Sequence, residues 1–308
     1  MDKSKTLRAA TVLVTAVFTL NAQQNDFQSP KSSGLTGPYL GQKIPGIIPE
    51  VFAPGIVSKD GVQSKLLISP DGLEIIFQNM ISAGSTPNDR KTCFVCIKME
   101  NDHWGLPANI PFSLEYTNDE PSLSADGQKL FFVSNRPSTG SKEPQKMSDI
   151  WVSLRTGEGW SEPVNPGLPV NTDGVEVQPF YSTENILYLG RNDGIYYSNY
   201  SNDHFSEPVK LDENIFKGRV RGICVSPDNE TLIVHSDMTV GYGKWDLYIS
   251  FKDKSGRWTR LINMGNSINT EQSEANATFS PDGKYLFFTR GDDIFWVSAK
   301  IIEKLKPK

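Results

Sequence analysis

The chain has 308 residues, of which 37% are apolar and 10% aromatic, and its formal net charge is −5. This composition provides enough apolar material for a large core, and it lacks the basic excess that nucleic-acid-binding domains carry. We therefore expect a globular protein without a nucleic-acid partner.

The N-terminal residues predict an export signal. Three basic residues precede an apolar run at residues 9–20, which ends at the small residue Ala22. This layout is typical of a secretory signal peptide, and the run is too short to span a bilayer. A helix that packs in the core is the alternative interpretation. We expect a periplasmic or secreted protein made of a signal peptide, a flexible polar leader and one domain, at residues 1–22, 23–40 and 41–308.

A short turn sequence recurs along the rest of the chain, with copies roughly 50 residues apart. Ser-Pro-Asp-Gly occurs at residues 69–72 and 280–283, and altered copies begin at Ser124, Ser182 and Ser226. Pro fixes φ, Asp offers a local acceptor and Gly permits positive φ, while aromatic and β-branched runs flank each turn. A repeat of about 40 to 50 residues that contains only strands and turns predicts a β-propeller with one four-stranded blade per repeat.

Each repeat supplies its strands in the same order. An inner strand ends at the turn, a second strand follows it, and a third strand follows a loop. We expect the second strands at residues 73–78, 129–133, 186–189, 231–235 and 285–289, and the third strands at 93–98, 149–154, 194–199, 246–251 and 293–299. Outer-strand segments then follow at residues 106–111, 161–167, 206–211 and 259–265.

The last repeat lacks an outer strand of its own. Residues 49–58 match the outer-strand segments of the other repeats and precede the first inner strand. We therefore predict an all-β, five-bladed propeller, closed by an N-terminal strand that completes the C-terminal blade and removes the free sheet edges. A sixth blade would need another repeat within residues 26–61, where no such turn sequence occurs.

The motifs resemble a known group of proteins. The Ser-Pro-Asp-Gly turns, the Ile-Ile-Phe and Leu-Phe-Phe strands that follow them, and the Asp-Ile-Trp, Asp-Leu-Tyr and Asp-Ile-Phe strand starts are similar to the WD-like repeats of TolB-type bacterial propellers. The resemblance covers residues 49–298 and implies the fold. It implies no single activity, because the group includes non-catalytic periplasmic scaffolds and related propellers include lyases of uronic-acid polysaccharides.

One variable residue per repeat stands four positions before the turn. We expect these residues to ring the mouth of the central channel, where propeller ligands bind: Lys65, Glu120, Gln178, Gly222 and Asn276. The alternative is that they are polar residues that contact only ordered water.

Basic residues gather at the ends of the second strands and in the crossing before the fourth turn. A guanidinium matches a carboxylate or a sulfate, so several of them on an acidic protein indicate an anionic ligand. Alternatively, they pair with local Asp and Glu side chains. With the polar ring residues, they complete the predicted ligand-binding set: Arg136, Arg191, Arg219, Arg221 and Arg290.

Two functions of different classes remain open. The first is a lyase or dehydratase that performs β-elimination on uronate-containing, optionally sulfated oligosaccharides. The arginines, with Gln178 or Asn276, would neutralise the carboxylate, and His235, with a reference pKa of about 6.5, or Tyr242 would remove the proton. The second is a non-catalytic propeller that binds an envelope protein or a glycan. We expect a monomer without a membrane span, a metal ion or a cofactor, because no phosphate loop or dense ligand cluster occurs.

Overall fold

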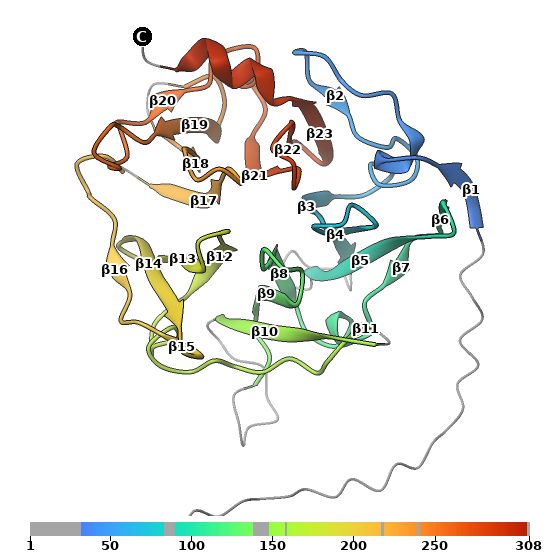
Figure 1. Cartoon of the computed structure of the whole chain (residues 1–308), viewed down its shortest axis with the longest axis horizontal. Helices are drawn as coiled ribbons and strands as arrows, with labels where there is room; N and C mark the ends of the chain where they lie inside the picture. The colour runs from blue at the N-terminus through green and yellow to red at the C-terminus, as the bar shows by residue number, and fades with distance from the viewer. Residues whose placement is uncertain are drawn as a thin grey trace, which may run out of the picture. The chain divides into compact units, whose positions relative to one another are not determined.

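The computed structural model describes residues 32–82, 90–137, 148–157, 159–216, 219–238 and 241–306. In this part of the chain the strands form five sheets, which lie around a common axis as the blades of a propeller (Figure 1). The predicted five-bladed, all-β fold is confirmed. The expected signal peptide and residues 23–31 of the expected leader lie outside the described residues.

Three strands of each blade lie where the repeat predicts them. The inner strands, which define blades 1 to 5 in chain order, are β3 (Gln63–Ile68), β8 (Asn118–Leu123), β12 (Val177–Tyr181), β17 (Val220–Val225) and β21 (Glu274–Phe279). The second strands are β4 (Glu74–Ser82), β9 (Lys129–Ser134), β13 (Ile186–Arg191), β18 (Thr231–Ser236) and β22 (Tyr285–Arg290). The third strands are β5 (Arg90–Glu100), β10 (Asp149–Thr156), β14 (Gly194–Ser201), β19 (Asp246–Phe251) and β23 (Asp293–Ser298).

Hydrogen bonds explain why the turn sequence recurs between the first two strands of a blade. The hydroxyl of Ser69 donates to Asp71 at 2.5 Å and accepts from the N–H of Glu74 at 2.8 Å. Gly72 takes a φ of 75°, which a side chain would disfavour. The same serine contacts recur in the turns at Ser124, Ser226 and Ser280. The aspartates of these turns therefore stabilise hairpins.

The outer strands are much shorter than the others. Each contains two residues: β7 (Ala108–Asn109), β16 (Val209–Lys210), β20 (Ile262–Asn263) and β2 (Glu50–Val51). In blade 2 the corresponding segment contributes one bridge, between Val152 and Val164. Short hairpin strands and 3-10 helices complete the described elements: β6 (His103–Gly105), β11 (Gly159–Trp160), β15 (His204–Phe205), η1 (Tyr39–Gly41), η3 (Pro111–Ser113) and η4 (Ala299–Leu305). No helix in the described ranges has the length and apolar character needed to cross a membrane.

Part of the expected flexible leader is ordered. Residues Ser32–Thr36 form β1, which pairs with β6 at the edge of blade 1. The hydroxyl of Ser33 donates to the carbonyl of Trp104, and the indole N–H of Trp104 donates to the carbonyl of Gly37, both at 2.7 Å. The expectation of little order therefore fails for this segment, because backbone pairing and the buried indole hold it against the blade.

The N-terminal strand closes the ring as predicted. β2 pairs antiparallel with β23, and Val51 lies opposite Phe295. The next residue, Phe52, is fully buried, and its N–H donates to the carbonyl of Ile294 at 2.8 Å. Its ring centroid lies 5.2 Å from that of Phe287 and 5.1 Å from that of Trp296. Blade 5 thus joins the two ends of the propeller through one aromatic cluster.

Replacing Phe52 by Ala should lower the free energy of unfolding by about 3 to 5 kcal/mol, because it leaves a cavity where the ring is closed. Urea denaturation followed by tryptophan fluorescence measures the change. Leu168→Ala removes an exposed side chain and should change stability by no more than about 0.5 kcal/mol. Equal midpoints for F52A and the parent protein would contradict the closure.

Candidate functional site

The five ring positions are equivalent in the structure. In each inner strand the pairing register shifts at this position, as at a β-bulge, where a strand can re-aim a side chain. The ring residues all lie in the left-handed region, with φ values of 43° for Lys65, 56° for Glu120, 56° for Gln178, 57° for Gly222 and 54° for Asn276. Because all five share this conformation, it belongs to the architecture of the blade.

Each bulge frees one backbone N–H from its own sheet, and that N–H donates to a side chain of the preceding blade. The five bonds run around the axis: Lys65 N to Thr289 Oγ1 (3.4 Å), Glu120 N to Gln78 Oε1 (2.8 Å), Gln178 N to Glu120 Oε2 (2.6 Å), Gly222 N to Gln178 Oε1 (2.7 Å) and Asn276 N to His235 Nδ1 (3.5 Å). Polar side chains near the axis therefore hold the blades together.

His235 occupies the ring position that Gly222 leaves empty. A Cβ on Gly222 would lie 2.3 Å from both Cε1 and Nδ1 of the imidazole, so only glycine fits beneath it. The imidazole is 6% exposed. Burial, with the charges of Lys65 and Arg221, lowers the pKa of His235 to about 3. His235 is therefore neutral at neutral pH, and a group with this pKa is a weak general base there.

Lys65 and Glu120 carry the charges of the ring. The side chain of Lys65 is 4% exposed, and its ammonium has no ion-pair or hydrogen-bond partner among the described residues. Burial lowers the pKa of Lys65, while Glu120 opposes this shift. Burial and the neighbouring Asp119 raise the pKa of Glu120 to about 7, although Lys65 and the N–H of Gln178 act against the rise. The ring therefore holds two titratable groups whose pKa values are shifted by burial and by each other.

Three of the five predicted arginines are structural. Arg290 pairs with the buried Glu274 at 2.9 Å and donates to the carbonyl of Ile268 at 2.7 Å. Arg191 pairs in the same way with the buried Glu176 at 3.2 Å and donates to the carbonyl of Pro169 at 3.1 Å. Both arginines therefore form the local ion pairs that the alternative interpretation expects, and their contact with a ligand stays a prediction.

Arg136 forms no ion pair with an acidic residue in the described part of the chain. Its guanidinium donates to Asn118 at 3.0 Å and to the carbonyl of Phe112 at 3.1 Å, and it lies 5.3 Å from the ring of Trp151. The side chain is buried. Arg136 thus fixes the crossing into blade 2, as Arg191 and Arg290 fix later crossings, and its role in ligand binding stays a prediction.

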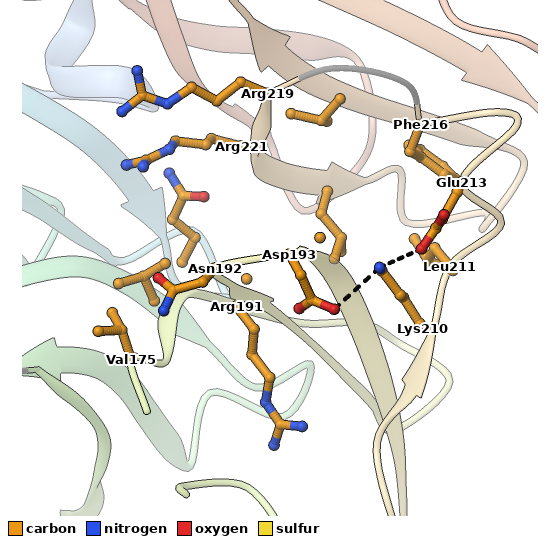
Figure 2. Close-up of a pocket in the computed structure, with 16 residues that line it drawn as sticks. Val175, Arg191, Asn192, Asp193, Lys210, Leu211, Glu213, Phe216, Arg219 and Arg221 are labelled. Carbon is orange, nitrogen blue, oxygen red and sulfur yellow. Dashed lines mark hydrogen bonds and ion pairs between the residues drawn. The ribbon is translucent and has the colours of Figure 1, made fainter. Parts of the chain in front are cut away.

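The remaining two arginines lie on the wall of a cavity of about 490 Å³ between blades 3 and 4. Figure 2 shows Arg219 and Arg221 extending side by side, while Arg191 points away from them. Arg219 is exposed and forms a 3.6 Å ion pair with Asp237. Arg221 is exposed too, and its guanidinium has no ion-pair or hydrogen-bond partner within the described ranges. Gln178 also lines the cavity and links it to the ring.

The opposite wall of the cavity carries one ammonium group and two carboxylates. Lys210 pairs with Asp193 at 3.1 Å and also with Glu213 (Figure 2). The pairing lowers the pKa of Asp193 and raises that of Lys210. A ligand therefore meets a paired but net acidic cluster on this wall and the guanidinium groups of Arg219 and Arg221 on the other.

The two predicted catalytic residues do not form a unit. Tyr242 is 50% exposed in the loop before β19, and no contact between its side chain and His235 occurs in the described part of the chain. The ring of Trp245 instead lies 5.3 Å from His235 and 5.4 Å from the guanidinium of Arg219. Trp245 was not predicted, because nothing in the repeat marks the residue that precedes Asp246. Nor do the described residues include a group of three or more His, Cys, Asp or Glu side chains that could hold a metal ion.

Comparison with known proteins adds little to this geometry. No family model and no curated protein matches the sequence. Similar solved structures include a TolB protein from Agrobacterium tumefaciens, with 16% identity over 75% of this chain and 71% of that one and a TM-score of 0.47. A gluconolactonase from Xanthomonas campestris is 13% identical over 86% of this chain and 98% of that one, with a TM-score of 0.47. A glycosyl hydrolase from Bacteroides ovatus is 9% identical over 80% of this chain and 86% of that one, with a TM-score of 0.44. Such weak likenesses carry no argument about a ligand or an activity.

Gly222→Ala should destabilise the protein by about 1 to 3 kcal/mol through overpacking against His235, in addition to about 1 kcal/mol for an alanine at positive φ. In the double variant G222A/H235A the overpacking is absent, so a double-mutant cycle in urea should give a coupling of about 1 to 3 kcal/mol. Gly72→Ala is the matched control, since its φ is 75° and no atom lies within 4 Å of its added Cβ. Additive effects of G222A and H235A would contradict the packing described.

Proposed function

We propose that this propeller binds acidic oligosaccharides, and that Arg219 and Arg221 hold a carboxylate or sulfate of the ligand in the cavity between blades 3 and 4. The observation that carries the proposal is the exposed guanidinium of Arg221, which has no partner in the described residues while Arg191 and Arg290 pair with buried glutamates. A planar guanidinium matches a carboxylate through two parallel hydrogen bonds. A second cation two residues away strengthens the site for an anion.

The rest of the cavity suits a sugar. Its volume of about 490 Å³ lies within the usual range for small-ligand sites. Asn192, Asp193 and Glu213 offer hydrogen-bonding groups for hydroxyls, and Phe216 offers an apolar face for a pyranose ring. An inorganic anion would use only the arginines. These additional groups therefore favour an anionic carbohydrate as the ligand.

The arrangement supports binding better than β-elimination. Elimination needs a base beside the carbon next to the bound carboxylate. Burial lowers the pKa of His235 to about 3, and its Nδ1 accepts the N–H of Asn276. The hypothesis of His235 as the base is therefore not favoured, and Tyr242 makes no contact with it in the described part of the chain. We thus place the chain with propellers that bind without turnover, and we propose that the expected signal peptide exports it to such glycans.

Replacing Arg221 by Gln should weaken binding of an oligogalacturonide by about 10-fold to 100-fold, because a hydrogen bond to a charged group contributes about 1.5 to 3 kcal/mol. Isothermal titration calorimetry with the mature chain measures the affinity, which should also fall with added salt. Arg257→Gln, which changes an exposed arginine that pairs with Asp253, is the matched control and should bind like the parent. Equal affinity for the oligogalacturonide and its carboxyl-reduced form would contradict the proposal.

Incubation of the parent protein with the same oligogalacturonide should produce no unsaturated uronate, followed by its ultraviolet absorbance and by product mass. The physical reason is that an imidazole with a pKa of about 3 is neutral at neutral pH but is too weak a base to abstract a carbon-bound proton. Turnover by the parent that H235A abolishes would contradict the non-catalytic proposal and restore His235 as the base.

A further inference from the structure

An apolar depression lies where the five inner strands meet their turns, at the end of β17 opposite to the one that holds Arg221. It is a cavity of about 230 Å³, and the described residues that line it include no charged side chain. Each inner strand contributes one or more apolar side chains, among them Leu67, Leu123, Phe180, Val225 and Phe279. Since a cavity of about 150 Å³ can hold a benzene ring, this depression has room for an aromatic side chain.

The hydroxyl groups around the depression are already engaged within the chain. Five of those that line it donate their proton to acceptors of this protein: Ser124, Tyr181, Thr183, Thr278 and Ser280. The hydroxyl of Ser122, the other one in the described lining, is 2% exposed and accepts the N–H of Tyr181 at 3.0 Å. The depression therefore offers a sugar few free donors, and an apolar side chain is the better match, because it leaves no polar group unpaired.

Two further cavities join the depression, and we call the three together the turn-face groove. A cavity of about 300 Å³ between blades 5 and 1 shares Ile68 and Pro281 with the depression. A cavity of about 470 Å³ between blades 2 and 3 shares Ala125 and Tyr181 with it. The turn-face groove thus runs from one boundary between blades, over the axis, to another.

Carboxylates line both ends of the turn-face groove. Two lie at each end: Asp71 and Asp282 between blades 5 and 1, and Asp126 and Asp203 between blades 2 and 3. Hydrogen bonds from the turn serines lower the pKa of Asp71 and Asp126, so both are ionised at neutral pH. Two ammonium groups offset the four carboxylates in part, since Lys284 pairs with Asp282 at 2.9 Å and Lys129 lines the second end. The described residues therefore give the groove acidic ends and an apolar centre.

We propose that the turn-face groove binds an extended segment of a partner protein, in which one aromatic side chain stands between lysine or arginine residues. The aromatic side chain enters the depression on the axis, and the basic side chains on either side of it pair with the carboxylates at the two ends. The charges select a basic segment, and the apolar centre fixes its register. Arg219 and Arg221 line a different cavity, so this inference does not rest on the proposed glycan.

Amide NMR titration of the isotope-labelled mature chain with capped synthetic peptides tests the proposal. The probe is Lys-Lys-Phe-Lys-Lys, and its controls carry Ala in place of Phe or Glu in place of every Lys. We expect the probe to shift amides of the groove, including that of Ala125, and each control to bind about 10-fold more weakly or worse, because it lacks the apolar or the electrostatic contact. An Ala control that binds as tightly as the probe, or a probe that shifts no amide of the groove, would overturn the proposal.

Ala125→Arg blocks the groove with a large cation. Ala125 is exposed, lines two of the three cavities and occupies the second position of its turn, which accepts most residue types, so the variant should fold. We expect A125R to weaken binding of the probe by about 10-fold or more, because a like charge then faces the peptide. Ile48→Arg is the matched control, since it adds the same charge at a side chain that is 75% exposed and outside the groove, and it should bind like the parent. Equal affinity of A125R and the parent for the probe would rule out this groove.

Other occupants of the groove give different results. A second copy of this chain would appear in analytical ultracentrifugation as a dimer of the parent that A125R dissociates. A neutral oligosaccharide would shift the same amides, and added salt would leave its affinity unchanged. Either result overturns the proposal, which requires a monomer whose affinity for the probe falls as salt is added.

Discussion

In each inner strand one residue leaves the extended conformation, and the contacts between blades at the axis depend on it. The left-handed bulge takes a backbone N–H out of its own sheet and directs it to a side chain of the blade before. A buried N–H needs an acceptor, so the preceding blade must place a polar side-chain atom beside each bulge. The chemistry of the ring is thus limited by the backbone: Gln78, Glu120, Gln178, His235 and Thr289 all serve as acceptors before they can serve a ligand.

The arginines show how position decides the role of one residue type. Arg191 and Arg290 end second strands, and in both blades a glutamate lies beside them at the start of the inner strand. Both glutamates are fully buried, so removal of either arginine would leave a buried charge without its partner. Arg221 lies within an inner strand, opposite His235, and meets no such carboxylate in the described residues. An arginine that meets no carboxylate of its own chain can pair with one from a ligand.

The repeat made the fold predictable. The turn serines, the period and the outer-strand match of residues 49–58 determine the number of blades and the pairing of β2 with β23, because each depends on local sequence. The roles of the arginines were not predictable in this way. Nothing near Arg290 in sequence reveals that Glu274 lies 2.9 Å from it, since the two residues meet only through the pairing of β21 with β22.

The pKa of His235 was even harder to predict from the sequence than the roles of the arginines. Its strand register places it toward the axis, as the sequence predicts, but its pKa depends on how deeply it is buried and on charges from other blades. One signal was present: Gly222 is the single glycine among the five ring positions, and a missing side chain in a repeated polar position indicates that another group fills the space.

Access to solvent distinguishes the arginines of the cavity wall from the charged residues of the ring. Arg219 and Arg221 are exposed on the wall of a cavity between blades, where water screens their charge and a large ligand can reach them. Lys65 lies at a buried ring position, where water screens charge less than at the exposed arginines. The bulge at Lys65 directs its backbone N–H to Thr289 of the preceding blade, so this residue also joins two blades. Substitutions in the crossing before blade 4 can therefore change the outer ligand, while the ring keeps the hydrogen bonds that hold the blades together.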